Sequence, residues 1–349
     1  MTSERFAVQK LTVLLATQFD VTDADREAIT RAVPQATVRV EPIRPDQVDA
    51  LDANGADVVL LDGALPRDLE PWRHVRFIQV LTAGVSQYGV DHSIWRTGIP
   101  LATASGIHAV PMAEYAMCTL LMLAQQMPQM AEFRRDREWW DSPRRQAYGG
   151  HTLRGWTAGI VGYGSIGREC GRLAHQLGMR VLAMKRDPER RRDEGFIGWP
   201  GTGDAQGTIP EKWFAPDQVG DMLAETDVLM ITCPRTDATR GLIGDDELRR
   251  MSPRSYVLVI SRGGIIDEAA LCRALHEGTI AAATVDGYAK EPTCRDHPLF
   301  DAPNVIMTPH LSGYFDQYWA TGLKLLCENL RRLVSDRPLL NVADGKLQY

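Results

Sequence analysis

A glycine-rich turn between two apolar runs constrains the fold of this chain more than any other feature. An apolar run from Ala158 to Val161 leads into the turn Gly162-Tyr163-Gly164-Ser165-Ile166-Gly167, and a helical pattern then continues to Leu177. Gly178 is suited to end that helix before a second apolar run, Arg180 to Met184. The G-x-G-x-x-G spacing alone is a weak signal, but strand, turn, helix and strand in this order predict the βαβ unit of a dinucleotide-binding domain.

Each glycine of this turn has a separate physical task in such a unit. Gly162 allows the tight turn, Gly164 lets the main chain approach a pyrophosphate, and Gly167 lets the helix pack closely on the strand. The positive end of the helix attracts the phosphate charge. The alternative is a glycine-rich turn that binds no ligand, and the surrounding strand and helix pattern favours the nucleotide site.

The whole chain alternates between strand and helix patterns, which predicts an α/β fold with doubly wound parallel sheets. With 349 residues the chain exceeds the size at which one hydrophobic core usually divides, so two domains are expected. The predicted strands of the first part are Leu11 to Ala16, Val38 to Val40, Val58 to Leu61, Phe77 to Leu81 and Pro100 to Ala102. Those of the second part are Ala158 to Gly162, Arg180 to Met184, Val228 to Cys233, Tyr256 to Ile260, Ala281 to Val285 and Val305 to Met307.

Composition narrows the classes of partner. The formal net charge of −6 gives no support for nucleic acid or an anionic membrane as the main partner, so a small ligand is favoured. No apolar run approaches the length needed to cross a bilayer. The six cysteines have no metal-ligand spacing, and we expect no metal site and reduced core thiols in a cytoplasmic protein. They are Cys118, Cys170, Cys233, Cys272, Cys294 and Cys327.

Residues at the end of the second strand of the βαβ unit bear on the choice of coenzyme. An acidic residue there would accept hydrogen bonds from the ribose 2′-hydroxyl of NAD, but this chain has Lys185-Arg186-Asp187. An arginine can grip a 2′-phosphate with two hydrogen bonds, so NADP is favoured over NAD. The alternative is that the basic residues form a solvated loop and that Asp187, two residues beyond the expected position, binds the ribose 2′-hydroxyl of NAD.

Three side chains downstream of this unit have the properties needed for hydride chemistry on a small anion. Arg262 is a permanent cation, His310 can transfer a proton near neutral pH, and Glu291 can orient and charge the imidazole. Taken singly, Glu291 and His310 are better explained by structural roles than by catalysis. Their joint placement after apolar strands favours catalysis.

Over nearly its whole length the chain resembles the D-isomer-specific 2-hydroxyacid dehydrogenase family, because several sequence motifs typical of that family occur in the same order. The residues that carry the resemblance are Thr82-Ala83-Gly84-Val85, Ser105 to Glu114, Gly162 to Gly167, Ser261-Arg262-Gly263-Gly264-Ile265-Ile266-Asp267-Glu268, Asp286 to Pro292 and Thr308-Pro309-His310. Two positions depart from the family pattern, Val259 and Gly287-Tyr288, and neither removes a reacting group.

The resemblance implies a domain order. A Rossmann dinucleotide-binding domain, residues 109–308, would be inserted into a flavodoxin-like substrate domain made of residues 1–108 and 309–349. The active site would lie in the cleft between the domains. A homodimer formed through the dinucleotide-binding domains is also implied.

The resemblance further implies the roles of individual residues. Main-chain N–H groups of Ala83, Gly84 and Val85 would bind the substrate carboxylate, and Asp286 would hold the nicotinamide carboxamide. The remaining cofactor contacts are expected from Gly162, Gly164, Ser165, Ile166, Gly167, Lys185, Arg186, Cys233, Pro234, Ile260 and Ser261.

The expected reaction interconverts a small 2-oxo acid and its D-2-hydroxy acid with NADP or NAD. His310 would protonate the oxygen on which charge develops, Glu291 would orient His310, and Arg262 would bind and polarise the substrate. Two alternatives remain open. One is a dehydrogenase of a non-carboxylate anion such as phosphite, a phosphonate or formate, and the other is a dinucleotide-sensing protein without turnover.

Three segments have no fixed role in this scheme. The apolar stretch from His108 to Met130 predicts a helix that either forms a central core or joins two domains and lines a subunit contact. A surface loop with Trp139 and Trp140 follows it. The glycine-rich segment from Pro188 to Pro216 has no clear periodicity. It could cover the adenosine end of the coenzyme or be a passive surface insertion.

Overall fold

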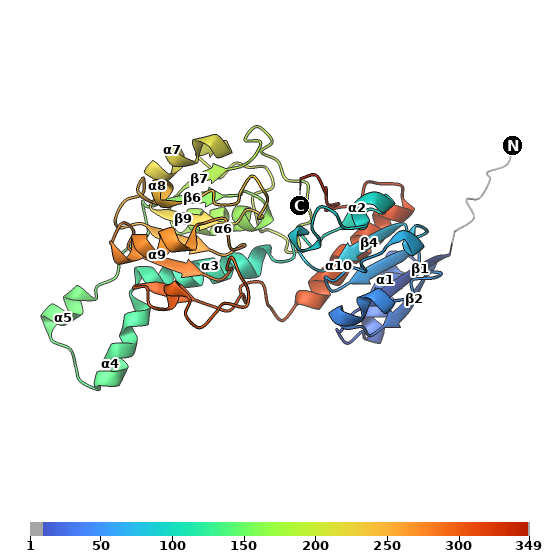
Figure 1. Cartoon of the computed structure of the whole chain (residues 1–349), viewed down its shortest axis with the longest axis horizontal. Helices are drawn as coiled ribbons and strands as arrows, with labels where there is room; N and C mark the ends of the chain where they lie inside the picture. Colours follow the sequence, from blue (N-terminus) through green and yellow to red (C-terminus); the bar gives the residue numbers. More distant parts are fainter. Residues whose placement is uncertain (1–9, 348–349) are drawn as a thin grey trace. The chain divides into compact units, whose positions relative to one another are not determined.

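The computed structural model describes residues 10–347, which divide by their contacts into two compact units (Figure 1). Unit 1 contains the chain up to His108, the short segment Gly195–Gly198 and the chain from Phe315 onward. Unit 2 contains Ala109–Glu194 and Trp199–Tyr314. The domain boundary expected at residues 308 and 309 therefore differs from this division, which groups His310 with unit 2.

Unit 1 is built on a five-stranded parallel sheet with the strand order β2-β1-β3-β4-β5. Its strands are β1 (Leu11–Ala16), β2 (Ala36–Glu41), β3 (Val58–Leu61), β4 (Phe77–Val80) and β5 (Leu101–Ala102). Side chains alternate along β1, so that Val13 and Leu15 join one hydrophobic cluster and Leu14 and Ala16 join another on the opposite face. The sheet is therefore buried on both faces, as expected for parallel strands.

Two long helices cover one face of this sheet. Helix α1 (Asp23–Ala32) begins at a capping box, in which the Thr22 hydroxyl accepts from the Asp25 N–H and the Asp25 carboxylate accepts from the Thr22 N–H at 2.9 Å. Helix α10 (Tyr318–Val334) buries Leu323, Leu326 and Leu330 against the same cluster, at the spacing predicted for one helix face. The opposite face is covered by α2 (Ile94–Thr97) and by 3-10 turns at Pro45–Ala50 and Glu70–Trp72.

Unit 2 is built on a seven-stranded parallel sheet with the strand order β12-β11-β10-β9-β6-β7-β8. Its strands are β6 (Thr157–Val161), β7 (Arg180–Met184), β8 (Lys212–Phe214), β9 (Val228–Ile231), β10 (Tyr256–Val259), β11 (Ala282–Val285) and β12 (Val305–Met307). The order reverses between β6 and β9, which is the pattern of a doubly wound dinucleotide-binding sheet. Both sheets are parallel, and the predicted fold class is confirmed.

Helices cover both faces of the second sheet. One face packs on α3 (Ala109–Ala124) and α6 (Ser165–Gln176), and the other packs on α7 (Val219–Ala224), α8 (Asp245–Leu248) and α9 (Glu268–His276). Side chains alternate along β9 between the two faces. Val228 and Met230 lie in the hydrophobic cluster with α3 and α6, whereas Leu229 and Ile231 lie in the cluster with α7, α8 and α9. The expected apolar helix after His108 is α3, and it forms part of this core.

The segment from residue 188 to 216 contains an edge strand, β8, that the sequence pattern did not predict. The segment is tied to α6 by Arg168, which is only 2% exposed and donates to the main-chain carbonyls of Arg191, at 2.6 Å, and Asp204. The Asp204 carboxylate accepts from the Tyr163 hydroxyl at 3.0 Å. A buried guanidinium with several acceptors holds its partners firmly, because leaving any of them unpaired is costly.

The stretch predicted as a surface loop contains two short helices, α4 (Met130–Asp136) and α5 (Ser142–Ala147), which project from the body of unit 2 (Figure 1). The prediction of a loop is wrong for α5 and for the end of α4. Arg144 lies over the ring of the buried Trp140, with 4.2 Å between the guanidinium carbon and the ring centre, and pairs with Asp136 at 2.8 Å. Trp139 is 79% exposed.

All six cysteines are free thiols, as predicted. Cys170, Cys233 and Cys327 are buried and Cys272 is partly buried against the core, so the expectation of core positions is wrong for Cys118 and Cys294, which are exposed. Within residues 10–347, none of the helices has the length and apolar character required to cross a bilayer.

Candidate active site

Four neighbouring strands of unit 2 share one carboxyl edge of the sheet, and three of them carry the predicted catalytic residues. Strands β9, β10, β11 and β12 are paired in parallel, so their carboxyl ends meet along the same edge. Arg262 follows β10, Asp286 and then Glu291 follow β11, and His310 follows β12. This edge is where open α/β sheets usually bind their ligands.

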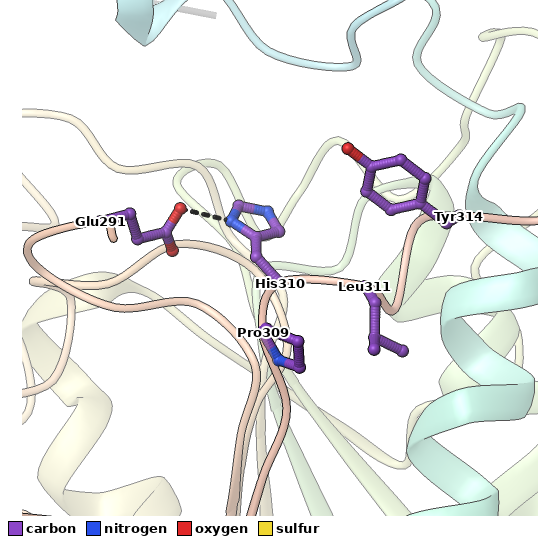
Figure 2. Close-up of a pocket in the computed structure, with 5 residues that line it drawn as sticks. All are labelled: Glu291, Pro309, His310, Leu311 and Tyr314. Atoms are coloured by element: carbon purple, nitrogen blue, oxygen red, sulfur yellow. Dashed lines mark hydrogen bonds and ion pairs between the residues drawn. The ribbon is translucent and has the colours of Figure 1, made fainter. Parts of the chain in front are cut away.

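His310 and Glu291 form a direct pair (Figure 2). The His310 Nδ1 atom lies 2.7 Å from Glu291 Oε2, and both side chains are 36% exposed. The second carboxylate oxygen of Glu291 accepts from the Tyr288 N–H at 2.8 Å, which fixes the carboxylate. His310 lines a pocket with Glu291, Pro309, Leu311 and Tyr314, and within the described residues its Nε2 atom makes no hydrogen bond. The carboxylate therefore orients the ring and leaves Nε2 for chemistry.

Asp286 holds the loop that carries His310. Its carboxylate is buried, and it accepts hydrogen bonds from the Thr308 hydroxyl at 2.6 Å, the Leu311 N–H at 2.8 Å and the Ser312 N–H at 3.0 Å. His310 itself has a φ of +51°, a left-handed conformation that non-glycine residues adopt only when the surroundings impose it. Three hydrogen bonds to one buried carboxylate provide that constraint.

Two tyrosines complete this support. The Tyr115 hydroxyl on α3 lies 2.6 Å from the Thr308 hydroxyl, and burial raises the pKa of Tyr115 to about 12. The Tyr288 hydroxyl donates to the carbonyls of Val285 and Thr308 at 3.0 and 2.9 Å, and burial raises its pKa to about 12 as well. Both tyrosines are thus neutral hydroxyls at ordinary pH. Sequence reasoning missed both roles, because only the fold brings Tyr115 to β12.

Arg262 is a half-buried cation beside this pair. Its Nη1 group donates to the Ser261 carbonyl at 3.0 Å, and no ion pair with a carboxylate is formed among the residues that the structure describes. Burial lowers the pKa of Arg262, and the nearby Glu291 carboxylate acts in the opposite direction. An arginine stays charged through such a shift, so this site offers an anion a guanidinium that forms no direct ion pair among the described residues.

The glycine-rich turn has the geometry needed to hold a dinucleotide. Gly162 has a φ of +99°, and a Cβ atom there would lie 2.5 Å from the Cys233 main chain. A Cβ at Gly167 would lie 2.3 Å from the Gly162 carbonyl, so neither position accepts a larger residue. A Cβ at Gly164 would meet no atom within 4 Å, and Gly164 is the N-cap of α6 and has no side chain to cap the helix, so a phosphate could approach this end of the helix.

The other predicted cofactor residues surround this turn. Ser165 and Ile166 open α6, Cys233 and Pro234 follow β9, and Ile260 and Ser261 follow β10. These strands flank one another in the sheet, so the residues share the carboxyl edge with the turn. Cys233, Ile260 and Ser261 are buried.

The basic residues after β7 differ in their surroundings. Lys185 Nζ donates to the Arg190 carbonyl at 2.7 Å, and burial lowers the pKa of Lys185. The Asp187 carboxylate closes a turn by accepting from the N–H groups of Glu189 and Arg190 at 3.1 and 3.3 Å. Arg186 lies on the surface.

The predicted carboxylate-binding loop, Ala83-Gly84-Val85, follows β4 in unit 1. A Cβ built on Gly84 would meet no atom within 4 Å, so the main chain is accessible there. The Thr82 hydroxyl donates to the Gly84 carbonyl at 3.1 Å, and within the described residues the N–H groups of Gly84 and Val85 have no acceptor. The loop has donors to offer an anion.

One charged residue at the carboxyl edge was overlooked by the sequence reasoning. Arg235 follows Cys233 and Pro234 in the loop after β9, and its Cδ atom lies 3.6 Å from the position of a Cβ on Gly264, two residues beyond Arg262. Its place directly after a buried strand is the signal that could have found it, since the same rule identified Arg262.

Comparisons with known proteins show the family of the chain. A family model described as "D-isomer specific 2-hydroxyacid dehydrogenase, NAD binding domain" matches residues 117–312, more than half of the chain. The chain is 30% identical over 263 residues to glyoxylate reductase of Aeropyrum pernix, covering 73% of this chain and 72% of that protein. It is 28% identical over 326 residues to D-3-phosphoglycerate dehydrogenase of Archaeoglobus fulgidus, covering 87% of this chain but only 58% of that protein.

Solved structures extend the likeness in fold to nearly the whole chain. A D-isomer specific 2-hydroxyacid dehydrogenase from Xanthobacter autotrophicus, solved with NADPH and MES, superposes with a TM-score of 0.78 at 22% identity. The superposition covers 98% of this chain and 100% of that one.

Proposed function

Because the chain belongs to the D-isomer specific 2-hydroxyacid dehydrogenase family, we propose that it interconverts a small 2-oxo acid and its D-2-hydroxy acid by hydride transfer with a nicotinamide coenzyme. The observation that carries this proposal is the His310–Glu291 pair at the sheet edge that also bears Arg262. The names of relatives suggest glyoxylate and hydroxypyruvate as first candidate substrates.

The coenzyme would be held by the glycine-rich turn and the start of α6. Gly164 lets its pyrophosphate approach the main chain, and the uncapped N–H groups of the first helical turn donate to it. When bound, the reduced nicotinamide supplies a hydride. Ser165, Ile166, Cys233, Pro234, Ile260 and Ser261 would line its path along the sheet edge.

His310 would act as the proton donor during reduction and as the base during oxidation. The ketone oxygen of a 2-oxo acid gains negative charge as hydride adds to the carbon, and a proton must reach it. The pairing of Nδ1 with Glu291 orients the ring and points Nε2 away from the carboxylate. Asp286 would keep this ring in position through the loop, in addition to its proposed contact with the nicotinamide carboxamide.

Arg262 would bind and polarise the substrate. Its fork of N–H groups can hold one carboxylate oxygen and the ketone oxygen together, and its charge stabilises the oxygen as it becomes negative. The lack of an ion pair to Arg262 among the described residues supports this role, because a cation already paired with a carboxylate would bind an anion weakly. Ala83, Gly84 and Val85 of unit 1 are proposed to donate main-chain N–H groups to the substrate carboxylate.

A substrate panel tests the proposal directly. The purified protein would be mixed with NADPH or NADH and with glyoxylate, hydroxypyruvate, phenylpyruvate or oxaloacetate, and the absorbance of the reduced nicotinamide followed. We expect oxidation of the coenzyme with at least one acid. Phosphite and formate, assayed in the oxidative direction, serve as comparison substrates. Coenzyme binding without turnover on any compound would refute the proposal.

We propose NADP as the preferred coenzyme, with Arg186 as the residue that recognises the 2′-phosphate. The Asp187 carboxylate already accepts two hydrogen bonds within its own turn, so it is less suited to bind the ribose 2′-hydroxyl of NAD. Arg186→Gln should weaken NADPH binding about 10- to 100-fold, the effect of one charge-assisted hydrogen bond, with little change for NADH. Dissociation constants from nucleotide fluorescence would measure this. Arg249→Gln, an exposed ion-pair residue on the same unit, is the matched control; equal effects on both nucleotides would contradict the assignment.

We also propose a homodimer formed through unit 2. Apolar side chains on the outer face of α3 and on the projecting segment support this, since Leu121, Met127 and Trp139 are 40%, 52% and 79% exposed. Sedimentation analysis should give twice the chain mass of 38.8 kDa. A monomer at micromolar concentration would contradict it.

A further inference from the structure

A second guanidinium lies beside Arg262 at the carboxyl edge of the sheet, and no role has yet been given to it. Strands β9 and β10 are paired with Ile231 opposite Val259, so the loops that follow them leave the sheet side by side. Arg235 is four residues beyond Ile231, and Arg262 is three residues beyond Val259. The parallel register therefore brings the two arginines to neighbouring places.

The path of the loop turns Arg235 toward the side of the sheet that carries Arg262. Cys233 packs on Gly162, which belongs to the nucleotide turn after β6. Two residues later, the Arg235 side chain packs on Gly264, which follows Arg262. Hydrogen bonds from Gly241 N–H to the Gly264 carbonyl at 2.8 Å and from Ile243 N–H to the Ile265 carbonyl at 3.1 Å hold the two loops together.

Neither arginine is neutralised by a carboxylate of the protein. Within residues 10–347, Arg235 makes no ion pair or hydrogen bond, and Arg262 donates only to its neighbouring carbonyl. The two nearby carboxylates are already engaged, since Glu291 binds His310 and the Tyr288 N–H, and Asp286 accepts three hydrogen bonds from its loop. Burial lowers the pKa of Arg262, the charge of Arg235 acts in the same direction, and the Glu291 and Asp286 carboxylates act against it.

Two half-buried like charges repel each other, and a ligand that supplies additional negative charge relieves that repulsion. A 2-oxo acid with a single carboxylate provides one negative charge, which Arg262 and the main-chain donors would already satisfy. A substrate with a second anionic group would satisfy both cations. We infer that Arg235 selects 2-oxo acids that carry a second anionic group, a carboxylate, sulfonate or phosphate, remote from the ketone.

This inference rests on the proposed function and narrows its substrate class. The rival ligand for Arg235 is a phosphate of the coenzyme, because β9 lies between β6 and β10 in the sheet. The packing on Gly264 favours the substrate side. The experiment must therefore measure coenzyme binding and substrate selection separately.

The test compares pairs of acids that have the same chain length and differ in charge. Oxaloacetate and 2-oxobutyrate form one pair, and 2-oxoglutarate and 2-oxopentanoate form the other. The unmodified protein should prefer the dianion of at least one pair in kcat/KM. Arg235→Gln should lower kcat/KM for that dianion about 10- to 100-fold, the effect of losing one charge-assisted contact, and change the monoanion less than about threefold. Arg235→Lys should restore part of the preference, since it restores the charge without the fork.

Two further measurements keep the outcomes distinct. Arg240→Gln removes the same charge from an exposed position in the same loop and should leave the preference unchanged. Binding of malonate, a dicarboxylate without a ketone, should weaken in Arg235→Gln when followed by thermal shift, whether or not turnover is seen.

Three results would overturn the inference. The first is a higher kcat/KM for the monoanion in both pairs. The second is an equal loss of kcat/KM for both members of the pair in Arg235→Gln. The third is a loss confined to NADPH affinity, which would assign Arg235 to the coenzyme. If no 2-oxo acid were turned over but malonate binding still depended on Arg235, the proposed reaction would be refuted and the site for a dianion would be supported.

Discussion

Replacing His310 by alanine should lower kcat by about 10²- to 10⁴-fold, the range expected when a positioned proton donor is lost. The affinity for NADPH should stay nearly the same, because the glycine-rich turn proposed to hold the coenzyme follows β6, whereas His310 follows β12 at the far end of the strand order. Stopped-flow measurement of NADPH oxidation at saturating 2-oxo acid would give kcat, and nucleotide fluorescence would give the affinity.

The design of the His310 experiment includes two companion variants. His276→Ala removes an exposed histidine from the end of α9 in the same unit and should leave kcat unchanged. Glu291→Gln should give a smaller loss than His310→Ala, because the ring remains but loses the carboxylate that orients it. If His310→Ala turns over at the rate of the unmodified protein, the proton donor must be another group.

Replacing Arg262 by alanine should lower kcat/KM by at least about 10²- to 10³-fold, the effect reported for removing one donor to a developing oxyanion. Because Arg262 is proposed to hold the substrate as well as to polarise it, both KM and kcat should change, whereas His310→Ala should act mainly on kcat. Steady-state kinetics over a range of 2-oxo acid concentrations would separate these two effects.

A conservative variant distinguishes charge from shape at this position. Arg262→Lys keeps a cation but cannot form two parallel hydrogen bonds, so it should recover only part of the lost kcat/KM. Full recovery would mean that the fork geometry is unimportant. An unchanged kcat/KM in Arg262→Ala would remove the residue from the mechanism.

Much of the sheet structure could be predicted from the sequence, because parallel strands buried on both faces have nearly continuous apolar runs. The predicted bounds of β1, β3, β7 and β12 match the structure. Strand β8 was missed, since its three residues lie in a polar, glycine-rich segment and their conformation depends on pairing with β7. Helix α5 was missed for a similar reason, as its contacts are made by Arg144 with residues of α4.

The site shows the same limit. Arg262, Glu291 and His310 could be predicted because each follows an apolar run and has distinctive chemistry, and the structure brings Glu291 and His310 together as expected. The link from Tyr115 through Thr308 to Asp286 could not be predicted, because it joins α3 to strands more than 160 residues away in the chain. Nor could the sequence predict that the Asp286 carboxylate accepts hydrogen bonds from the loop of His310.

The buried guanidinium of Arg168 has an evolutionary consequence. Its acceptors are carbonyls of residues 191 and 204, which belong to the connection between β7 and β8. A homologue with a short connection would therefore bury the guanidinium without these acceptors. The long connection and the arginine should therefore have been acquired together and should disappear together among descendants. Engineers who wish to shorten this connection would have to replace Arg168 by an apolar residue in the same step.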